Sequence, residues 1–284
     1  MTEEVRYHRL RPAQAVARRK ACPVAYVPLG TLEWHGPHNP LGADGLQAEG
    51  LAEVCARTGG GLVFPTLYYG ESRVTSLVDS APASREAIAR EMDLPAENFL
   101  PERQPFSATD QALAYHRLLV HVLAEMQSLG FRVAVLVAGH YPLVDLARAA
   151  AVQWVKLRLP DRTAMLAWAC VDYLLVRDRW PQAGDHAGGW ETSHILALHP
   201  ETVDLSALPP RESADELVST GTRWPPWEAS ADFGHETLRA AADAVLREVN
   251  DRLAHPEDYR AHGGALCEGL WRERPAQDPD TQAP

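Results

Sequence analysis

The residues of this chain best suited to chemistry lie in one short polar segment. Glu33, His35, His38 and Asp44 occur close together in a stretch rich in glycine and proline, directly after the apolar run Val24–Leu29. Such a stretch forms neither a helix nor a regular strand. Carboxylate and imidazole groups together are ligands that suit Zn, Mn or Fe. The segment therefore predicts a divalent metal site.

The spacing within this segment supports the prediction and also leaves an alternative open. Glu33 and His35 are two positions apart, so on an extended chain they point to the same side. The turn formed by Gly36, Pro37, Pro40 and Gly42 allows Asp44 to return towards them. The alternative is a polar surface loop in which Asp44 caps a helix that starts near Gly45.

Length and composition narrow the class of protein. The chain has 284 residues, of which 46 % are hydrophobic, enough for one large α/β domain or two small ones. It lacks a run of the roughly 20 apolar residues needed to cross a bilayer, and its charged N-terminus is unlike a signal peptide. We therefore expect a cytoplasmic protein without a membrane segment.

The net charge and the arrangement of the cysteines argue against further classes of protein. A formal charge of −11 argues against a nucleic-acid surface, which needs a basic stripe. Cys22, Cys55, Cys170 and Cys267 are scattered singly, which suits neither a disulfide framework nor a thiolate zinc site. Free thiols agree with a reducing compartment. No glycine-rich nucleotide motif and no Gly-x-Ser-x-Gly elbow occurs.

Apolar runs alternate with helical patterns along the chain, which predicts an α/β fold with a mostly parallel sheet. The predicted strands are Val24–Leu29, Leu62–Leu67, Phe131–Ala138 and Thr163–Val171. The predicted helices are Leu46–Arg57, Ala112–Leu129, Leu143–Leu159 and Ser230–Leu253. We interpret residues 72–107, which contain four prolines, as an excursion with a short helix near 84–92, acting as a lid or an oligomer contact. One domain over residues 1–273 is expected, with 274–284 as a disordered tail.

Two further loops are candidates for the functional site, because ligands of open α/β sheets bind beyond the carboxyl ends of the strands. His140 follows Gly139 at the end of the apolar strand Phe131–Ala138, at the same end as Glu33; a helix-capping or packed histidine is an equal alternative. His186 and Glu191 lie in a glycine-containing loop before an apolar pattern. They could supply a proton donor and a ligand. The alternatives are a solvated histidine and a glutamate that complements a helix dipole.

Three segments taken together resemble the creatininase family of metal-dependent amidohydrolases. The matching segments are residues 28–44, 130–140 and 186–193, with weaker matches at 65–72 and 229–234. Their order and spacing hold over about residues 20–255. The resemblance implies a single-domain, three-layer α/β/α sandwich. It further implies a homo-oligomer, such as a hexamer, with two divalent ions (Zn, Mn or Fe) at the carboxyl ends of the strands.

The resemblance also implies roles for individual residues. Glu33 would bind one ion and His35 the other, with Asp44 bridging both and His140 as a further ligand. Glu191 would be a ligand or a catalytic carboxylate close to the ions, and His186 would handle protons near the substrate. The expected substrate contacts are Ser72, Tyr141 and Trp190.

The function expected from the resemblance is hydrolysis of a C–N amide bond, cyclic or of the formamide type, in a small molecule. A hydroxide bridging the two ions would attack, and a positioned histidine would protonate the leaving nitrogen. Alternatives are the same site acting as a peptide-maturation protease or on a cyclic inositol-derived ketone, or a non-catalytic structural member. Pro142 stands where creatininases proper carry a glutamate ligand, which puts creatinine itself and one metal position in doubt.

Overall fold

The computed structural model describes residues 4–70, 78, 82–158, 161, 163–218 and 224–260, without the side chains of 214–216. The predicted tail, residues 274–284, lies outside the described residues, as does the first part of the excursion predicted at 72–107.

Within the described residues, four parallel strands form the central sheet, in the order β2-β1-β3-β4. Their bounds are β1 Val24–Leu29, β2 Leu62–Val63, β3 Val133–Ala138 and β4 Leu166–Val171. β3 pairs over its whole length with β1 on one side and β4 on the other. Because all four strands run the same way, their carboxyl ends lie at one edge of the sheet. The predicted parallel sheet is confirmed.

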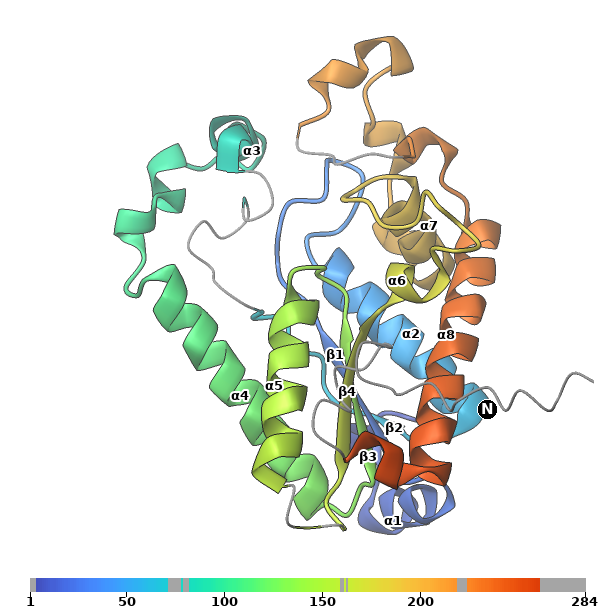
Figure 1. The fold of residues 1–284 in the computed structure, drawn as a ribbon. Helices are drawn as coiled ribbons and strands as arrows, with labels where there is room; N and C mark the ends of the chain where they lie inside the picture. Colours follow the sequence, from blue (N-terminus) through green and yellow to red (C-terminus); the bar gives the residue numbers. More distant parts are fainter. Residues whose placement is uncertain are drawn as a thin grey trace, which may run out of the picture.

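Helices cover both faces of the sheet (Figure 1). Their bounds are α1 Pro12–Ala21, α2 Ala43–Gly59, α3 Arg85–Glu91, α4 Ala108–Ser128, α5 Leu143–Arg158, α6 Asp172–Val176, α7 Gly189–Leu198 and α8 Ala231–Ala254. α4 and α5 lie on one face, and α2 and α8 on the other. The molecule is therefore a single-domain α/β/α sandwich, as expected.

Alternate strand residues divide between two hydrophobic cores, because successive side chains of a strand point to opposite faces. Tyr26 and Val135 pack towards α2 and α8. Val27 and Leu136 pack towards α4 and α5. Every residue of β1, β3 and β4 is buried, which explains their nearly continuous apolar sequences.

The second predicted strand is shorter than expected. It was predicted over Leu62–Leu67, but β2 ends at Val63 and only a single bridge joins Leu67 to Leu29. Pro65 lies within this run and has no N–H to donate to a ladder. The chain then returns to the sheet at Leu67, whose N–H donates to the carbonyl of Pro28.

The segment between β2 and α4 contains the short helix predicted near 84–92, observed as α3. Its apolar side chains form a third, small core around Trp34, composed of Val78, Ile88, Ala89 and Phe99. The segment therefore rests on the polar stretch that follows β1, and its role as a lid or an oligomer contact stays a prediction.

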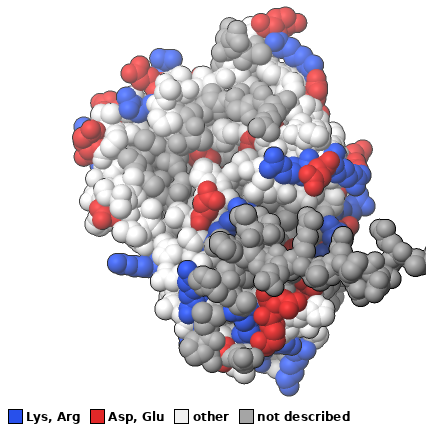
Figure 2. Space-filling view, viewed as in Figure 1, with Lys and Arg blue, Asp and Glu red and all other residues white. Residues whose placement is uncertain are grey.

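On the face shown in Figure 2, acidic and basic side chains are interspersed, and neither sign covers a continuous area. Among the described helices, none is both long and apolar enough to span a membrane.

Candidate metal centre

Five predicted ligands meet at the carboxyl edge of the sheet. Glu33 and His35 follow β1, His140 follows β3, Asp44 lies in the first turn of α2, and Glu191 lies in the first turn of α7. All five side chains are buried. Residues far apart in the sequence thus form one polar cluster inside the protein, as expected from their places at strand ends.

Two glycines allow this convergence, because the start of α2 is pressed directly against the ends of β1 and β3. A Cβ on Gly139 would lie 1.8 Å from the carbonyl oxygen of Asp44, and one on Gly30 would lie 2.4 Å from the backbone nitrogen of Gly45. Backbone atoms cannot yield to such contacts, so no larger residue fits. This close approach brings Asp44 between the residues that follow the two strands.

One group of possible ligands consists of Glu33, Asp44 and His140, whose ligand atoms lie within 4.8 Å of one another. Nδ1 of His140 is 2.8 Å from Oε1 of Glu33 and 3.3 Å from Oδ2 of Asp44. Apart from this contact with His140, the oxygens of Glu33 have no hydrogen-bond partner among the described residues. A buried carboxylate in that state needs a positive charge, and a divalent cation supplies one.

A second group consists of His35, Asp44 and Glu191, again within 4.8 Å. Nε2 of His35 is 3.2 Å from Oδ1 of Asp44 and 3.5 Å from Oε2 of Glu191. Nδ1 of His35 is 3.2 Å from the carbonyl oxygen of Glu33, which favours a proton on Nδ1. Nε2 is then the nitrogen with a lone pair for an ion. Asp44 faces the first group with Oδ2 and the second with Oδ1.

The pKa shifts within the metal-free cluster also indicate that its carboxylates attract positive charge. Burial by itself lowers the pKa of His35, but Asp44, Glu191 and Glu33 outweigh it and raise this pKa to about 10. Burial raises the pKa of Glu191 to about 8, against the attraction of His35. Burial also opposes ionisation of Asp44, yet His35 and His140 hold its pKa well below the ordinary value. The oxygen and imidazole donors fit Zn, Mn or Fe.

His186 lies beside the cluster at its more open side, with 18 % of its side chain exposed. Its Nε2 is 2.8 Å from the carbonyl oxygen of Trp34, and its ring centre is 4.5 Å from that of His35. Burial, aided by His35, lowers its pKa to about 4. Nδ1 is 3.8 Å from Oε1 of Glu33, so His186 also forms a third possible ligand group with Glu33 and His35. The geometry thus fits either a proton carrier or a ligand.

The residues that were predicted to contact the substrate differ in their surroundings. The ring of Tyr141 contacts that of Tyr173 in a tilted arrangement, with ring centres 4.6 Å apart, and burial raises the pKa of its hydroxyl well above the ordinary value. Trp190 is fully buried in the core between the sheet and α8, and its Nε1 donates to Asp172. We therefore assign Trp190 to packing beneath the cluster rather than to substrate contact. Ser72 lies outside the described residues.

The alternative readings of the polar segment are resolved by the structure. The residue before α2 is Gly42, so Asp44 is not a cap but turns its carboxylate into the cluster. His38 is buried away from both ligand groups, with Nε2 3.1 Å from Oγ1 of Thr192. Burial lowers its pKa to about 4. Glu191 accepts the N–H of Ala187, so it completes a helix start as well as facing His35.

Three buried residues near the cluster were not identified from the sequence. Asp185 accepts the backbone N–H groups of Trp190 and Glu191 and so fixes the first turn of α7. Gln47 donates to Glu191, and Asp172 accepts from Trp190. Asp172 directly follows β4, so the strand-end rule could have found it. A carboxylate just before a helix was the available signal for Asp185.

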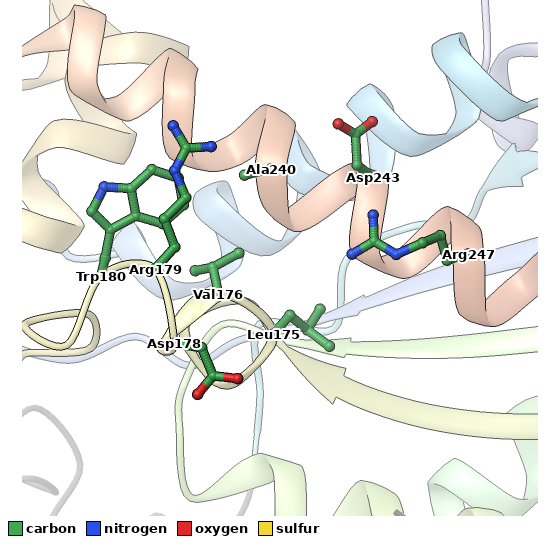
Figure 3. Close-up of a pocket in the computed structure, with 8 residues that line it drawn as sticks. All are labelled: Leu175, Val176, Asp178, Arg179, Trp180, Ala240, Asp243 and Arg247. Atoms are coloured by element: carbon green, nitrogen blue, oxygen red, sulfur yellow. The ribbon is translucent and has the colours of Figure 1, made fainter. Parts of the chain in front are cut away.

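A separate surface hollow of about 270 Å³ lies between α6 and α8 (Figure 3). Leu175, Val176 and Trp180 form its apolar side, and none of the ligand residues lines it. Arg179 lies over the ring of Trp180 and pairs with Glu236. The charged residues that line the hollow are exposed to solvent, so the hollow lacks the buried polar groups of the cluster.

Comparison with known proteins assigns the chain to a family. The family model described as creatinine amidohydrolase matches residues 8–82 and 99–254. A tryptophan-to-phenylalanine variant of creatininase has a TM-score of 0.63 at 22 % identity, covering 89 % of this chain and 100 % of that one. A search of the curated proteins finds no match.

Two further solved structures agree on the fold. A creatinine amidohydrolase (creatininase) gives a TM-score of 0.64 at 21 % identity, covering 88 % of this chain and 98 % of that one. A putative creatinine amidohydrolase from Bacteroides fragilis gives 0.59 at 18 %, covering 90 % and 98 %. Since the family model spans most of the chain and the fold agrees, the resemblance found in the three motifs is confirmed, and this chain belongs to the creatininase family.

Proposed function

We propose that this protein is a metal-dependent amidohydrolase with two divalent ions, cleaving a C–N bond of a cyclic amide or a formamide in a small molecule. The observation that carries the proposal is the position of Asp44, which belongs to two ligand groups and faces each with a different oxygen. A carboxylate placed in this way suits a pair of ions that share one ligand.

The ligands follow from the two groups. Glu33, Asp44 and His140 would hold one ion, and His35, Asp44 and Glu191 the other. Bound there, divalent ions supply Lewis acidity, which lowers the pKa of water and polarises a carbonyl oxygen. Structures of family members include a creatininase of Zn-Zn type and one named for Mn, which supports these metals as first choices.

The remaining steps belong to residues beside the ligands. His186 is the side chain next to the cluster with partial access to solvent, so we assign to it the proton delivered to the leaving nitrogen. Tyr141 directly follows His140 and would contact the substrate. Ser72 is proposed as a second contact on the strength of its place in the family motif alone.

The substrate is proposed as a small molecule because one relative is a creatininase complexed with creatine. Creatinine itself is disfavoured, since Pro142 cannot supply the glutamate ligand expected two residues after His140. A peptide-maturation protease and a hydrolase of a cyclic inositol-derived ketone are the other candidates for this site. The homo-oligomer expected from the family is a further prediction, checked by light scattering.

The test combines metal analysis with a substrate screen. Protein purified without added metal or chelator is analysed for Zn, Mn and Fe, then assayed on lactams, formamides and short peptides. About two ions per chain, together with C–N hydrolysis that chelation abolishes, would support the proposal. Finding one ion per chain would replace the proposed pair of ions with a mononuclear site, the second ion position being lost because Pro142 cannot supply a ligand. No ion after reconstitution would favour a non-catalytic member.

A further inference from the structure

A buried glutamine links the segments that carry the proposed ligands. Gln47 lies on α2, one turn after Asp44, and is almost completely buried. Its Nε2 donates to Oε1 of Glu191 at 3.2 Å and to the carbonyl oxygen of Gly139 at 3.2 Å. Gly139 precedes His140, so one amide group joins the start of α2, the end of β3 and the first turn of α7.

The orientation of this amide is determined by His194 on the neighbouring helix α7. Nδ1 of His194 is 3.4 Å from Oε1 of Gln47 and 3.5 Å from Oδ2 of Asp172. Both partners are acceptors, so Nδ1 carries the proton, and Nε2 meets the hydroxyl of Thr237 at 2.9 Å. A flipped Gln47 amide would place its oxygen against the carboxylate of Glu191. In the observed orientation the amide nitrogen of Gln47 meets two acceptors, and its oxygen faces the ring N–H of His194.

The hydrogen bond from Gln47 gives the two carboxylate oxygens of Glu191 different partners. Oε1 is held by Gln47. Oε2 accepts the N–H of Ala187 at 2.8 Å and lies 3.5 Å from Nε2 of His35. Glu191 therefore presents one particular oxygen to the group formed with His35 and Asp44. The other group, which contains Glu33 and His140, does not include Glu191.

We propose that Gln47 is a positioning residue that fixes Glu191 so that only its Oε2 faces the ion site shared with His35 and Asp44. The inference rests on the proposed function, because it assumes that Glu191 is a ligand. Hydrogen bonds to ligand residues typically change metal affinity about 10- to 100-fold when removed. Gln47 would exert this effect mainly on the ion shared with His35, because it bonds the ligand side chain of Glu191 there, whereas on the side of His140 it bonds only the backbone carbonyl of Gly139.

The experiment is a titration of the metal-free protein with Zn²⁺ against a chromophoric chelator, which separates the two dissociation constants. In Gln47→Met, which keeps the side-chain length but removes the amide, we expect one constant to rise about 10- to 100-fold. The other should stay within about twofold. Gln127→Met is the matched control, because the Gln127 amide accepts the N–H of Met165 at 3.1 Å, away from the ligands. Both constants should be unchanged there.

A double-mutant cycle separates positioning from general loosening. In a Glu191→Gln background, which keeps the ion held by Glu33, Asp44 and His140, Gln47→Met should change the affinity for that remaining ion by less than about twofold, because Gln47 acts through Glu191. Equal weakening of both ions, an additive effect in the cycle, or no effect of Gln47→Met would overturn the proposal. If Gln47→Met does not fold, Gln47→Asn replaces it, and the same single ion should weaken by a smaller factor. A wild-type protein that binds no ion would instead refute the proposed function, and this inference with it.

Discussion

Asp44 and Glu191 should differ sharply in what their loss does to bound metal. Asp44 belongs to both ligand groups, whereas Glu191 belongs to one. Replacing either carboxylate by its amide keeps the shape and removes the charge. We therefore expect Asp44→Asn to lose both ions, and Glu191→Gln to keep the ion held by Glu33, Asp44 and His140.

The size of the effect follows from the stability that bound ions add to the fold. An ion present at about 100 times its dissociation constant stabilises the native state by about 2.7 kcal/mol, so two ions add about 5.4 kcal/mol. For a domain of this size each kcal/mol shifts the melting temperature by about 2–4 °C. Chelation should therefore lower the melting temperature of the wild type by about 11–22 °C, and that of Glu191→Gln by about half as much. Asp44→Asn should respond by less than about 3 °C.

The assay is a thermal melt with and without chelator, run on samples whose metal content is measured in parallel. Asp243→Asn is a matched control, because Asp243 is an exposed acid on α8 and belongs to neither group; it should behave as the wild type. Two ions retained in Asp44→Asn would refute the bridging arrangement. Loss of both ions in Glu191→Gln would show that the groups are not independent.

Three other perturbations have defined outcomes. His186→Ala should lower turnover about 10²- to 10⁴-fold with both ions retained; a missing ion would make His186 a ligand instead. Gly139→Ala should reduce metal content and melting temperature together, because its Cβ would lie 1.8 Å from the carbonyl oxygen of Asp44; normal metal content would contradict this. Replacing Glu4 tests pH dependence: burial opposes its ionisation, but the hydrogen bonds and the charge of Arg6 together outweigh burial and lower the pKa of Glu4 to about 2. Since the folded pKa is the lower one, the stability difference between wild type and Glu4→Gln should be complete above about pH 5 and vanish as the pH falls towards 2; a constant difference in denaturant unfolding would refute it.

Much of the fold could be predicted because its pattern is local. β3 is an unbroken apolar run, and α8 has a helical period with Ser230 as its cap. Helix starts were less accurate: α4 begins at Ala108, where Ser107 accepts the N–H of Asp110, a few residues before the apolar period becomes clear. β2 is shorter than the apolar run Leu62–Leu67 because Pro65 has no N–H to donate to the ladder.

Site residues at strand ends could be predicted from the sequence. Residues whose contacts depend on how two helices pack against each other could not. His35 and His38 are equivalent by residue type. Gly36, with a φ of 74°, turns the chain between them, so that only His35 enters the cluster. The contact of Gln47 with Glu191 depends on how α2 packs against α7, a relation that no local sequence pattern contains.

The third core has a mechanical consequence for any attempt to redesign this protein. Trp34 stands between two proposed ligands in the sequence, and its side chain packs with Ile88 and Phe99 while its carbonyl contacts His186. The segment around α3 is therefore coupled to the ligand loop through Trp34, and the partly buried Leu41 of the same loop packs against this core as well. Substitutions in that segment that preserve the packing of Trp34 should leave the ion-binding geometry in place. Substitutions that loosen Trp34 would disturb the segment and the ligand loop together.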